Sequence, residues 1–382
     1  MSGRLTGVYT RYTQVSTLQF ILVLMVLVFP TEMFTLPAPL ALKAGLNAPW
    51  AVLVAGLEAL LPFVVGLWAS QGRSAVSLYA SLRLVSPPTA LLLALVFVGC
   101  VWALNVLVMA EYAEIVHGFL LPRTPLAIPV FFGITLVAFM TQSTLEPIAR
   151  MTEIVSVIGL PILALVFLLA MPYMDVHWVE PIWPQQPGLM LKTSILPASY
   201  LGEVVLVAVL GSHVAPGTRL LRAGIIATVF NTVILLVSLY LPLLLFGPVH
   251  TSVLSSPMLA AVRAIHYGYV LERLDTVVLP IWIVLICLKM AIIAFTGAEA
   301  LVNAAGHRKT KWLPSALVGS AGIASLYEFQ SLPSTIHVIG VMWSQWVFPI
   351  LVVSVAMSGL ALRLGEARST RPWSTAGPRP TS

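Results

Sequence analysis

The sequence predicts an all-α integral membrane protein with ten transmembrane helices, arranged as two halves of five that enter the bilayer from opposite faces. Three observations support this fold class. Hydrophobic residues make up 59% of the 382 positions and charged residues only 9%, whereas a soluble domain carries about 25% charged residues. Ten apolar runs are long enough to cross a bilayer core, and positive charges gather in alternate loops. This composition excludes a soluble enzyme and a disordered or disulfide-stapled chain.

The ten apolar runs define the predicted spans and one polytopic membrane domain over residues 1–363. A bilayer core of about 30 Å requires roughly 20 apolar residues per helix. The runs lie at about 17–41, 48–70, 88–118, 124–145, 151–172, 193–214, 221–247, 275–303, 312–330 and 336–362. The two predicted half-repeats are 17–172 and 193–362. Residues 364–382 are rich in Ser, Thr, Pro and Arg, which predicts a disordered cytoplasmic tail.

The distribution of positive charge predicts the topology. With a cytoplasmic N-terminus, fourteen lysines and arginines fall in inside segments, five fall in outside segments and Lys289 stays in the membrane, which accounts for all 20. This excess places both termini in the cytoplasm and supports an even number of spans. Five helices per half then require an inverted repeat, as in many secondary transporters. The connections 74–85 and 259–275, in matching positions of the two halves, are both long and amphipathic.

Helix-breaking residues mark the first span of each half. Pro30 and Pro37 interrupt the first span, because each lacks a backbone donor and crowds the carbonyl four residues earlier. The first span of the second half carries Pro and Gly in the run 197–203. Pro and Gly are often simple kinks in membrane helices, but here each break also carries a glutamate, Glu32 or Glu203. Matching breaks in two halves indicate a binding site near the midplane.

Charged side chains within the spans are the second sign of a site, and they are Glu32, Glu58, Glu111, Glu203 and Lys289. Each costs about 2.5–3.5 kcal/mol at a helix centre on insertion scales, so each needs a partner or a wet cavity. Lys289 lies deepest, and its helical face predicts inward packing. It forms a structural salt bridge to Glu203 or Glu32, serves a site, or does both. Glu58 and Glu111 are expected near the headgroups.

No other chemistry stands out in the sequence. The seven histidines are scattered without metal-ligand spacing, and the chain has no phosphate-cradling Gly-rich loop. The net charge of +6 does not indicate nucleic-acid binding, since the positive charges form no basic stripe with interleaved aromatics. We therefore expect neither an enzyme nor a cofactor, and no nucleic-acid partner.

Several motifs, in order along the chain, resemble those of a known family. Residues 262–275 read VRAIHYGYVLERLD, which resembles the R-x-I-x-x-G-x-x-x-E-R-x-D/E signature of spore germination proteins of the GerAB family, the integral B subunits of germinant receptors. The further matches are Thr35-Leu36-Pro37, Ala113-Glu114, the run 120–125 (LLPRTP), Leu145-Glu146 with Ala149-Arg150, and Gly202-Glu203. The resemblance covers about residues 14–362.

The resemblance implies membership of the amino acid–polyamine–organocation superfamily. It implies a LeuT-like fold of ten core helices with helices 1 and 6 broken, the same inverted repeat that the charges predict. It also implies a function, sensing a nutrient germinant, typically an amino acid, in the inner membrane of a bacterial spore. The implied partners are an A-type receptor subunit and a C-type lipoprotein.

The family's ligand pocket, carried over by alignment, gives the candidate ligand-binding residues. They are Pro30, Thr31, Glu32, Leu104, Val108, Leu201, Gly202, Glu203, Lys289 and Ile293. The sequence departs from the family pattern at the first break, where relatives commonly have Gly-x-Gly with free amides for a carboxylate. The family's arginine in span 3 is replaced by alanine here. Lys289 is the candidate to supply the missing positive charge.

If Glu32, Glu203 and Lys289 converge, the site holds two acids and one base. Two neighbouring carboxylates do not both ionise easily, so one is expected to keep a proton. A zwitterionic ligand then places its amine toward the acids and its carboxylate toward Lys289. The sequence leaves three functions open: a receptor subunit, a proton-coupled amino-acid transporter of the same fold, and a ligand-blind scaffold for partner subunits.

Overall fold

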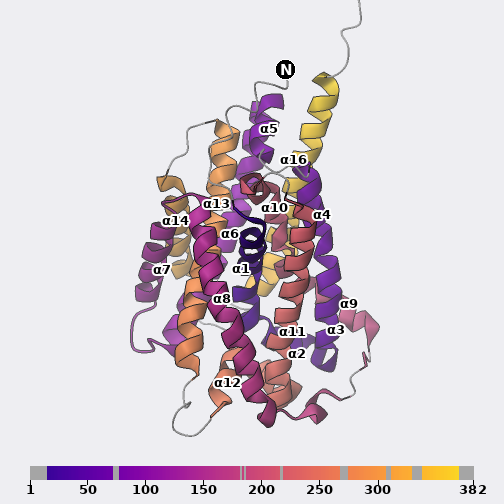
Figure 1. The fold of residues 1–382 in the computed structure, drawn as a ribbon, viewed down its shortest axis with the longest axis vertical. Helices are drawn as coiled ribbons and strands as arrows, with labels where there is room; N and C mark the ends of the chain where they lie inside the picture. The colour runs from indigo at the N-terminus through magenta and orange to yellow at the C-terminus, as the bar shows by residue number, and fades with distance from the viewer. Residues whose placement is uncertain are drawn as a thin grey trace, which may run out of the picture.

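The computed structural model describes residues 15–71, 77–180, 183–184, 186–215, 218–266, 274–306, 311–328 and 338–369. Within these residues the regular elements are helices, and the only strand-like contact is a bridge between Val15 and Val214. Figure 1 shows the long helices running side by side as one bundle, with α5 at one end and α12 at the other. These are called the α5 end and the α12 end below.

The first half contains α1 (Thr17–Thr35), α2 (Pro37–Ala44), α3 (Ala48–Glu58), α4 (Leu60–Ala69), α5 (Leu78–Val85), α6 (Pro87–Phe119), α7 (Ala127–Met140) and α8 (Leu145–Ala170). The second half contains α9 (Pro187–Leu201), α10 (Val207–Leu210), α11 (Leu220–Val253), α12 (Pro257–Ala264), α13 (Asp275–Ala305), α14 (Trp312–Glu328) and α16 (Phe348–Ser369). Two 3₁₀ turns, η5 (Gly202–Leu206) and η6 (Gly211–His213), flank α10, and the π-helical turn η7 (Ile339–Val347) precedes α16.

All ten predicted spans contain helix, which confirms the all-α membrane fold. In the part of the chain that the structure describes, eight helical stretches are long and apolar enough to cross a membrane. The fourth span of the first half is shorter than predicted, since α7 has 14 residues, or about 21 Å of helix. In the second half, the described part of the corresponding helix, α14, has 17 residues. These two short helices pack against each other and against α6.

The connecting helices confirm the inverted repeat. The helix α5 joins the second and third spans of the first half, and α12 joins the second and third spans of the second half. Each has eight residues, and Figure 1 places them at opposite ends of the bundle. Two matching elements on opposite faces are what a half that enters from the other side of the membrane produces.

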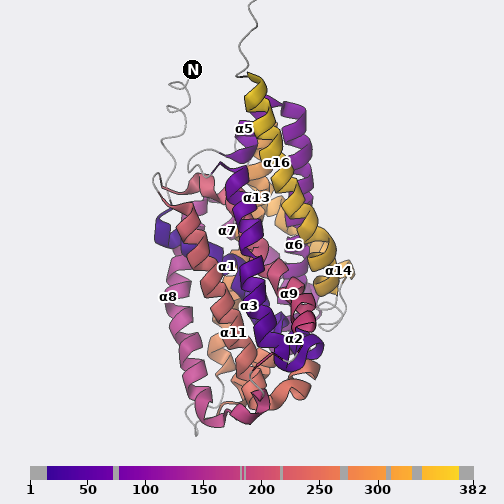
Figure 2. The same ribbon diagram turned by 90° about the vertical axis from the view of Figure 1, so that its right-hand side faces the viewer.

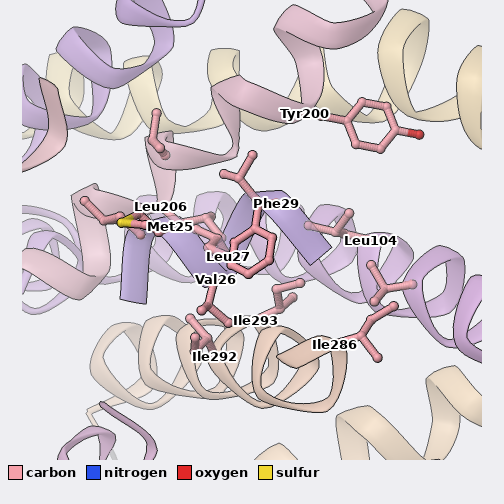
Figure 3. Packing of buried hydrophobic residues seen from close by; sticks show 14 of the residues in the cluster. Met25, Val26, Leu27, Phe29, Leu104, Tyr200, Leu206, Ile286, Ile292 and Ile293 are labelled. Carbon is pink, nitrogen blue, oxygen red and sulfur yellow. The ribbon is translucent and has the colours of Figure 1, made fainter. Parts of the chain in front are cut away.

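The helix α1 forms the centre of the bundle. A capping box starts it, because the Ser16 hydroxyl accepts from the Gln19 amide at 3.2 Å and the Gln19 side chain accepts from the Ser16 amide at 3.1 Å. From Leu22 to Thr35 every residue is buried, as expected of a helix that is apolar all round. The helices α11, α13 and α8 pack against it, and Figure 2 shows α8 and α11 beside it. Figure 3 shows Val26 and Phe29 facing α13.

The break in helix 1 lies later than the first proline. The helix α1 continues through Pro30 as far as Thr35, bends at Leu36 and restarts with Pro37 as the first residue of α2. Proline is well suited to that first position, where a missing amide costs no hydrogen bond. The predicted interruption at Pro30 is therefore wrong. The Pro30 carbonyl also accepts a hydrogen bond from the Trp282 indole at 2.7 Å, so tertiary contact supports the helix there.

Helix 6 is broken as predicted. The helix α9 ends at Leu201, and the chain tightens into η5 before the short helix α10. A glycine is needed at the start of η5, since a Cβ atom on Gly202 would lie 2.3 Å from the Phe348 ring and 3.0 Å from Pro62. The close approach of these two side chains holds the broken segment against α4 and α16.

The C-terminal helix extends beyond the predicted start of the tail at residue 364. The helix α16 continues to Ser369, because its last turns are attached to the end of α4. The Arg363 guanidinium lies 4.6 Å from the centre of the Trp68 ring, and Gln71 donates a 3.0 Å hydrogen bond to Glu366. The rest of the predicted tail lies outside the described residues.

Candidate functional site

A fully buried ion pair lies at the centre of the candidate site. The Lys289 Nζ atom on α13 lies 2.9 Å from the Glu203 Oε2 atom on η5, and neither side chain is exposed. The break in helix 6 places Glu203 in a 3₁₀ turn, and α13 presents Lys289 from the predicted inward face, on which Trp282, Ile286 and Ile293 are also buried. The salt bridge expected from the sequence is present.

Glu32 joins this pair from α1. Its side chain is fully buried and lies within electrostatic range of both Lys289 and Glu203. Neither of its carboxylate oxygens has a hydrogen-bond partner among the described residues. The three charged residues that the sequence singled out therefore come together, and they do so although α1 is helical at this point.

Glu111 is a fourth member that the sequence analysis missed. The expectation that it lies near the headgroups is wrong. Its side chain on α6 is fully buried, lies within electrostatic range of Lys289 and Glu203, and lies against the Thr31 hydroxyl. The sequence gives no local signal for this position. A helix of 33 residues is about 50 Å long and extends beyond a 30 Å core, so the distance of Glu111 from the helix end does not give its depth in the membrane.

Glu58 has a different environment from the other acids. It is partly exposed at the end of α3 and accepts a 2.9 Å hydrogen bond from the Ser194 hydroxyl on α9. This contact joins helices 2 and 6 away from the buried charges.

The remaining predicted residues are buried around the cluster. Thr31, Leu104, Val108, Leu201 and Ile293 are each at most 2% exposed, and Figure 3 shows Leu104 and Ile293 beside α1. Two predicted residues have structural contacts instead. The Pro30 carbonyl is occupied by the Trp282 indole, and Gly202 faces Phe348 and Pro62 rather than the charges.

A cavity of about 320 Å³ approaches the cluster from the α12 end. It is lined by Thr35, Leu36, Ala38, Pro39, Leu42, Lys43, Leu196, Tyr200, Ser252, Val253, Leu254, Ser255, Gly340 and Val341. Two of these residues connect it to the charges. Thr35 lies one helical turn from Thr31 and donates a 2.7 Å hydrogen bond to its carbonyl, and Tyr200 lies within electrostatic range of Glu32, Glu111 and Glu203.

A polar network closes the bundle on the α5 side of the cluster. His213 of η6 lies 3.4 Å from Glu299 of α13, and Asn303 donates to Glu299 at 3.0 Å and to Ser77 at 2.9 Å. Glu299 follows Lys289 by ten residues, or about 15 Å of helix. A second cavity, of about 390 Å³, lies on this side and is lined by Phe295 and Glu299. None of the four charged residues lines either cavity, but Thr35 and Tyr200 connect the first one to them.

The described residues contain no group of three His, Cys, Asp or Glu side chains placed to hold a metal ion. What the arrangement offers is three carboxyl groups and one ammonium group out of contact with water, contributed by α1, α6, η5 and α13. Charges buried in a membrane protein mark substrate, ion or proton pathways by default.

The fold and this site define a multi-pass membrane protein of the LeuT-like transporter architecture. The chain is similar to Mhp1, a nucleobase-cation-symport-1 family transporter solved in a closed conformation with bromovinylhydantoin bound, at 13% identity and a TM-score of 0.62 over 94% of both chains. It is also similar to the manganese transporter of Eremococcus coleocola, at 14% identity and a TM-score of 0.56 over 92% of this chain and 77% of that one. At such identities the likeness shows the fold alone. A search of curated protein sequences gave no match.

The sequence itself shows the family. The family described as "Spore germination protein" matches residues 14–331, and the chain belongs to that family. The match confirms the resemblance seen in the motifs. The family and the fold are of the permease type rather than of a catalytic enzyme.

Proposed function

We propose that the chain is the nutrient-sensing membrane subunit of a spore germinant receptor. It binds a small germinant of the amino-acid type near the membrane midplane and signals through an A-type subunit and a C-type lipoprotein. It resides in the spore inner membrane with both termini in the spore core. The family supports the role in germination, and the observation that carries the ligand site is the four charged side chains buried together between the two half-repeats.

The position of these charges suggests how binding becomes a signal. The Lys289–Glu203 pair joins α13 to the break in helix 6, while Glu32 and Glu111 bring α1 and α6 to the same point. A ligand whose charges replace part of this pair favours an arrangement in which η5 and α13 separate. The size of the shift is limited by the difference in ligand affinity between the two arrangements.

The segment around α12 is our candidate for contact with partner subunits or for gating. Arg263 on α12 donates to Asp275 at 2.9 Å, and its guanidinium lies 4.8 Å from the centre of the Phe119 ring. It therefore joins α12, α13 and the end of α6. Glu272 and Arg273 of the same motif lie outside the described residues. The family's most specific motif passes through this segment, away from the buried charges.

The alternative function is proton-coupled amino-acid transport by the chain alone. The chain shares the fold of the transporter Mhp1 over 94% of both chains, and this fold is compatible with transport. Buried carboxyl groups also suit proton coupling. Purified protein in liposomes decides between the two with radiolabelled amino acids and an imposed proton gradient. The receptor role is expected to give binding without concentrative uptake, and robust uptake by the chain alone would establish the transporter.

The receptor role itself is tested in spores. Deletion of the gene is expected to abolish the response to one nutrient and to leave germination by a receptor-independent trigger intact. Pull-down of the tagged chain from spore membranes is expected to recover an A-type subunit and a C-type lipoprotein. Normal nutrient germination in the deletion strain would contradict the proposal.

A further inference from the structure

The charges of the site do not balance. Glu32, Glu111 and Glu203 face one lysine, so the cluster would carry a formal charge of −2 with every group ionised. Lys289 is already paired with Glu203 at 2.9 Å, and the Glu32 oxygens accept no hydrogen bond from any described residue. A buried carboxylate without a partner is strongly disfavoured, so such an acid either keeps a proton or takes a cationic partner. A ligand group that carries positive charge therefore suits this site.

The site lacks the usual receptor for a ligand carboxylate. Such a receptor is a set of free backbone amides at an unwound helix, but α1 is continuous from Thr17 to Thr35. The break in helix 6 also uses its amides internally, since Gly202 donates to the Ala198 carbonyl and Val207 to the Val204 carbonyl. The lysine nearest the cavity mouth, Lys43, is exposed to water, where a charge pair contributes only about 0–1 kcal/mol.

The cavity has buried polar groups beside the cluster and exposed polar groups, Lys43 and Ser255, elsewhere in its lining. Its walls are mainly aliphatic, as at Leu36, Leu196 and Leu254. Its buried polar groups are Thr35, one turn of α1 from the Thr31–Glu111 contact, and Tyr200, within electrostatic range of the three carboxyl groups. A molecule that enters polar end first brings that end toward the acids and leaves its apolar part among the leucines.

We propose that the site recognises the ammonium group of its ligand together with a short apolar chain, and that a ligand carboxylate is dispensable. The ligand class is a primary alkyl amine, which includes amino acids by virtue of their ammonium group alone. This inference rests on the proposed function, because it names the chemistry of the same site. Glu111, which no family motif marks, is the specificity-determining residue together with Glu32.

The test is binding to the purified full-length protein by isothermal titration calorimetry with three matched sets of probes. Each set contains an amino acid, the amine that remains when its carboxylate is removed, and the acid that remains when its amine is removed: alanine, ethylamine and propionate; valine, isobutylamine and 3-methylbutanoate; leucine, 3-methylbutylamine and 4-methylpentanoate. We expect at least one amine to bind within about threefold of its amino acid, and its acid to bind at least about a hundredfold more weakly, a difference of roughly 2.7 kcal/mol. An amino acid more than about tenfold tighter than its amine, or no binding by any amine, would overturn the inference.

Substitutions of the buried acids test whether the amine binds at the cluster. Glu111→Gln and Glu32→Gln are each expected to weaken amine binding by about tenfold or more. Glu180→Gln is the matched control, because Glu180 is exposed and does not line the cavity, and it should change binding by less than about twofold. The comparison of probes on the unaltered protein needs no variant and decides the question even if a glutamine variant fails to fold. Deletion spores separate the two proposals: if no amine binds but deletion abolishes nutrient germination, the receptor role stands and the ligand class falls. If amines bind while deletion spores germinate normally, the reverse holds.

Discussion

The Lys289 ammonium group and the Glu203 carboxylate form an ion pair at 2.9 Å in which neither side chain has any exposed surface. Such a pair contributes little net stability, because the cost of removing both charges from water offsets their attraction. What it determines is position, since it attaches the break in helix 6 to the middle of α13. A pair that can exchange one partner for a ligand group is a suitable switch between two arrangements of these helices.

We therefore predict that Glu203→Gln and Lys289→Met each abolish the response of spores to nutrient while the protein still inserts into the membrane. Removing one partner leaves a buried charge uncompensated, at a cost of about 3–5 kcal/mol. The double variant removes both charges and is expected to recover much of the thermal stability of the purified protein without recovering the response. Normal germination in either single variant would show that the pair has only a structural role.

The convergence of Glu32, Glu203 and Lys289 can be predicted from the sequence for a physical reason. A charge in the middle of an apolar span has few ways to avoid its desolvation cost, so charges of opposite sign on different spans are expected to meet. The sequence misplaces Glu111, because distance from the end of its own span is a poor measure of distance from the membrane surface. Its helix is longer than the bilayer core, and only the structure shows where the core lies along it.

Helix breaks are predicted with uneven success, and the difference lies in tertiary contacts. The break at Gly202 is predicted correctly, because a glycine at that point permits contacts that no other residue allows. The break at Pro30 is not, because the loss of one backbone donor leaves the rest of a helix intact when the surrounding helices hold it. The hydrogen bond from Trp282, 252 positions away along the chain, has no signature in the local sequence. The cavity is likewise assembled from α2, α9 and η7 and has no sequence pattern of its own.

Replacing Gly202 by alanine is expected to destabilise the protein by about 1–3 kcal/mol, the usual range for overpacking. The new Cβ atom would lie 2.3 Å from the Phe348 ring. Gly99→Ala is the matched control, because a Cβ atom there would meet no neighbouring atom within 4 Å and Gly99 lies in the middle of α6, where alanine favours the helix. Thermal unfolding in detergent measures both, and Phe348→Ala should rescue the first. Equal stability of the two glycine variants would mean that the break does not depend on this contact.

Reversing the charge of Arg263 should impair signalling or assembly more than ligand binding. Arg263→Glu replaces the 2.9 Å contact to Asp275 with a repulsion and removes the contact with the Phe119 ring, far from the buried cluster. We expect pull-down of partner subunits or the germination rate to fall several-fold, with ligand affinity changed by less than about threefold. Arg150→Glu is the control, since Arg150 is exposed and pairs with Glu146 one turn away in α8. A large loss of affinity with intact assembly would place Arg263 in the ligand site instead.

Ligand affinity should depend on pH, and Glu32→Gly should weaken that dependence. The groups that face Glu32 are Lys289 and Glu203, with Glu111 and Tyr200 beside them. Lowering the pH adds protons to the carboxyl groups, so the cluster loses negative charge and an ammonium ligand loses its partners. Affinity is therefore expected to fall toward acid pH.

The probe is 3-methylbutylamine, whose ammonium group stays protonated throughout, so that any change of affinity with pH belongs to the protein. Titrations between about pH 5 and 9 on the unaltered protein should show a steeper fall than on Glu32→Gly, because the variant has one fewer carboxyl group to protonate. Glu180→Gln, at an exposed glutamate outside the cavity, should keep the steep profile. If the profiles of the unaltered protein and of Glu32→Gly coincide, Glu32 takes no part in recognising the ammonium group, and the cluster that reads the ligand is reduced to Glu111, Glu203 and Lys289.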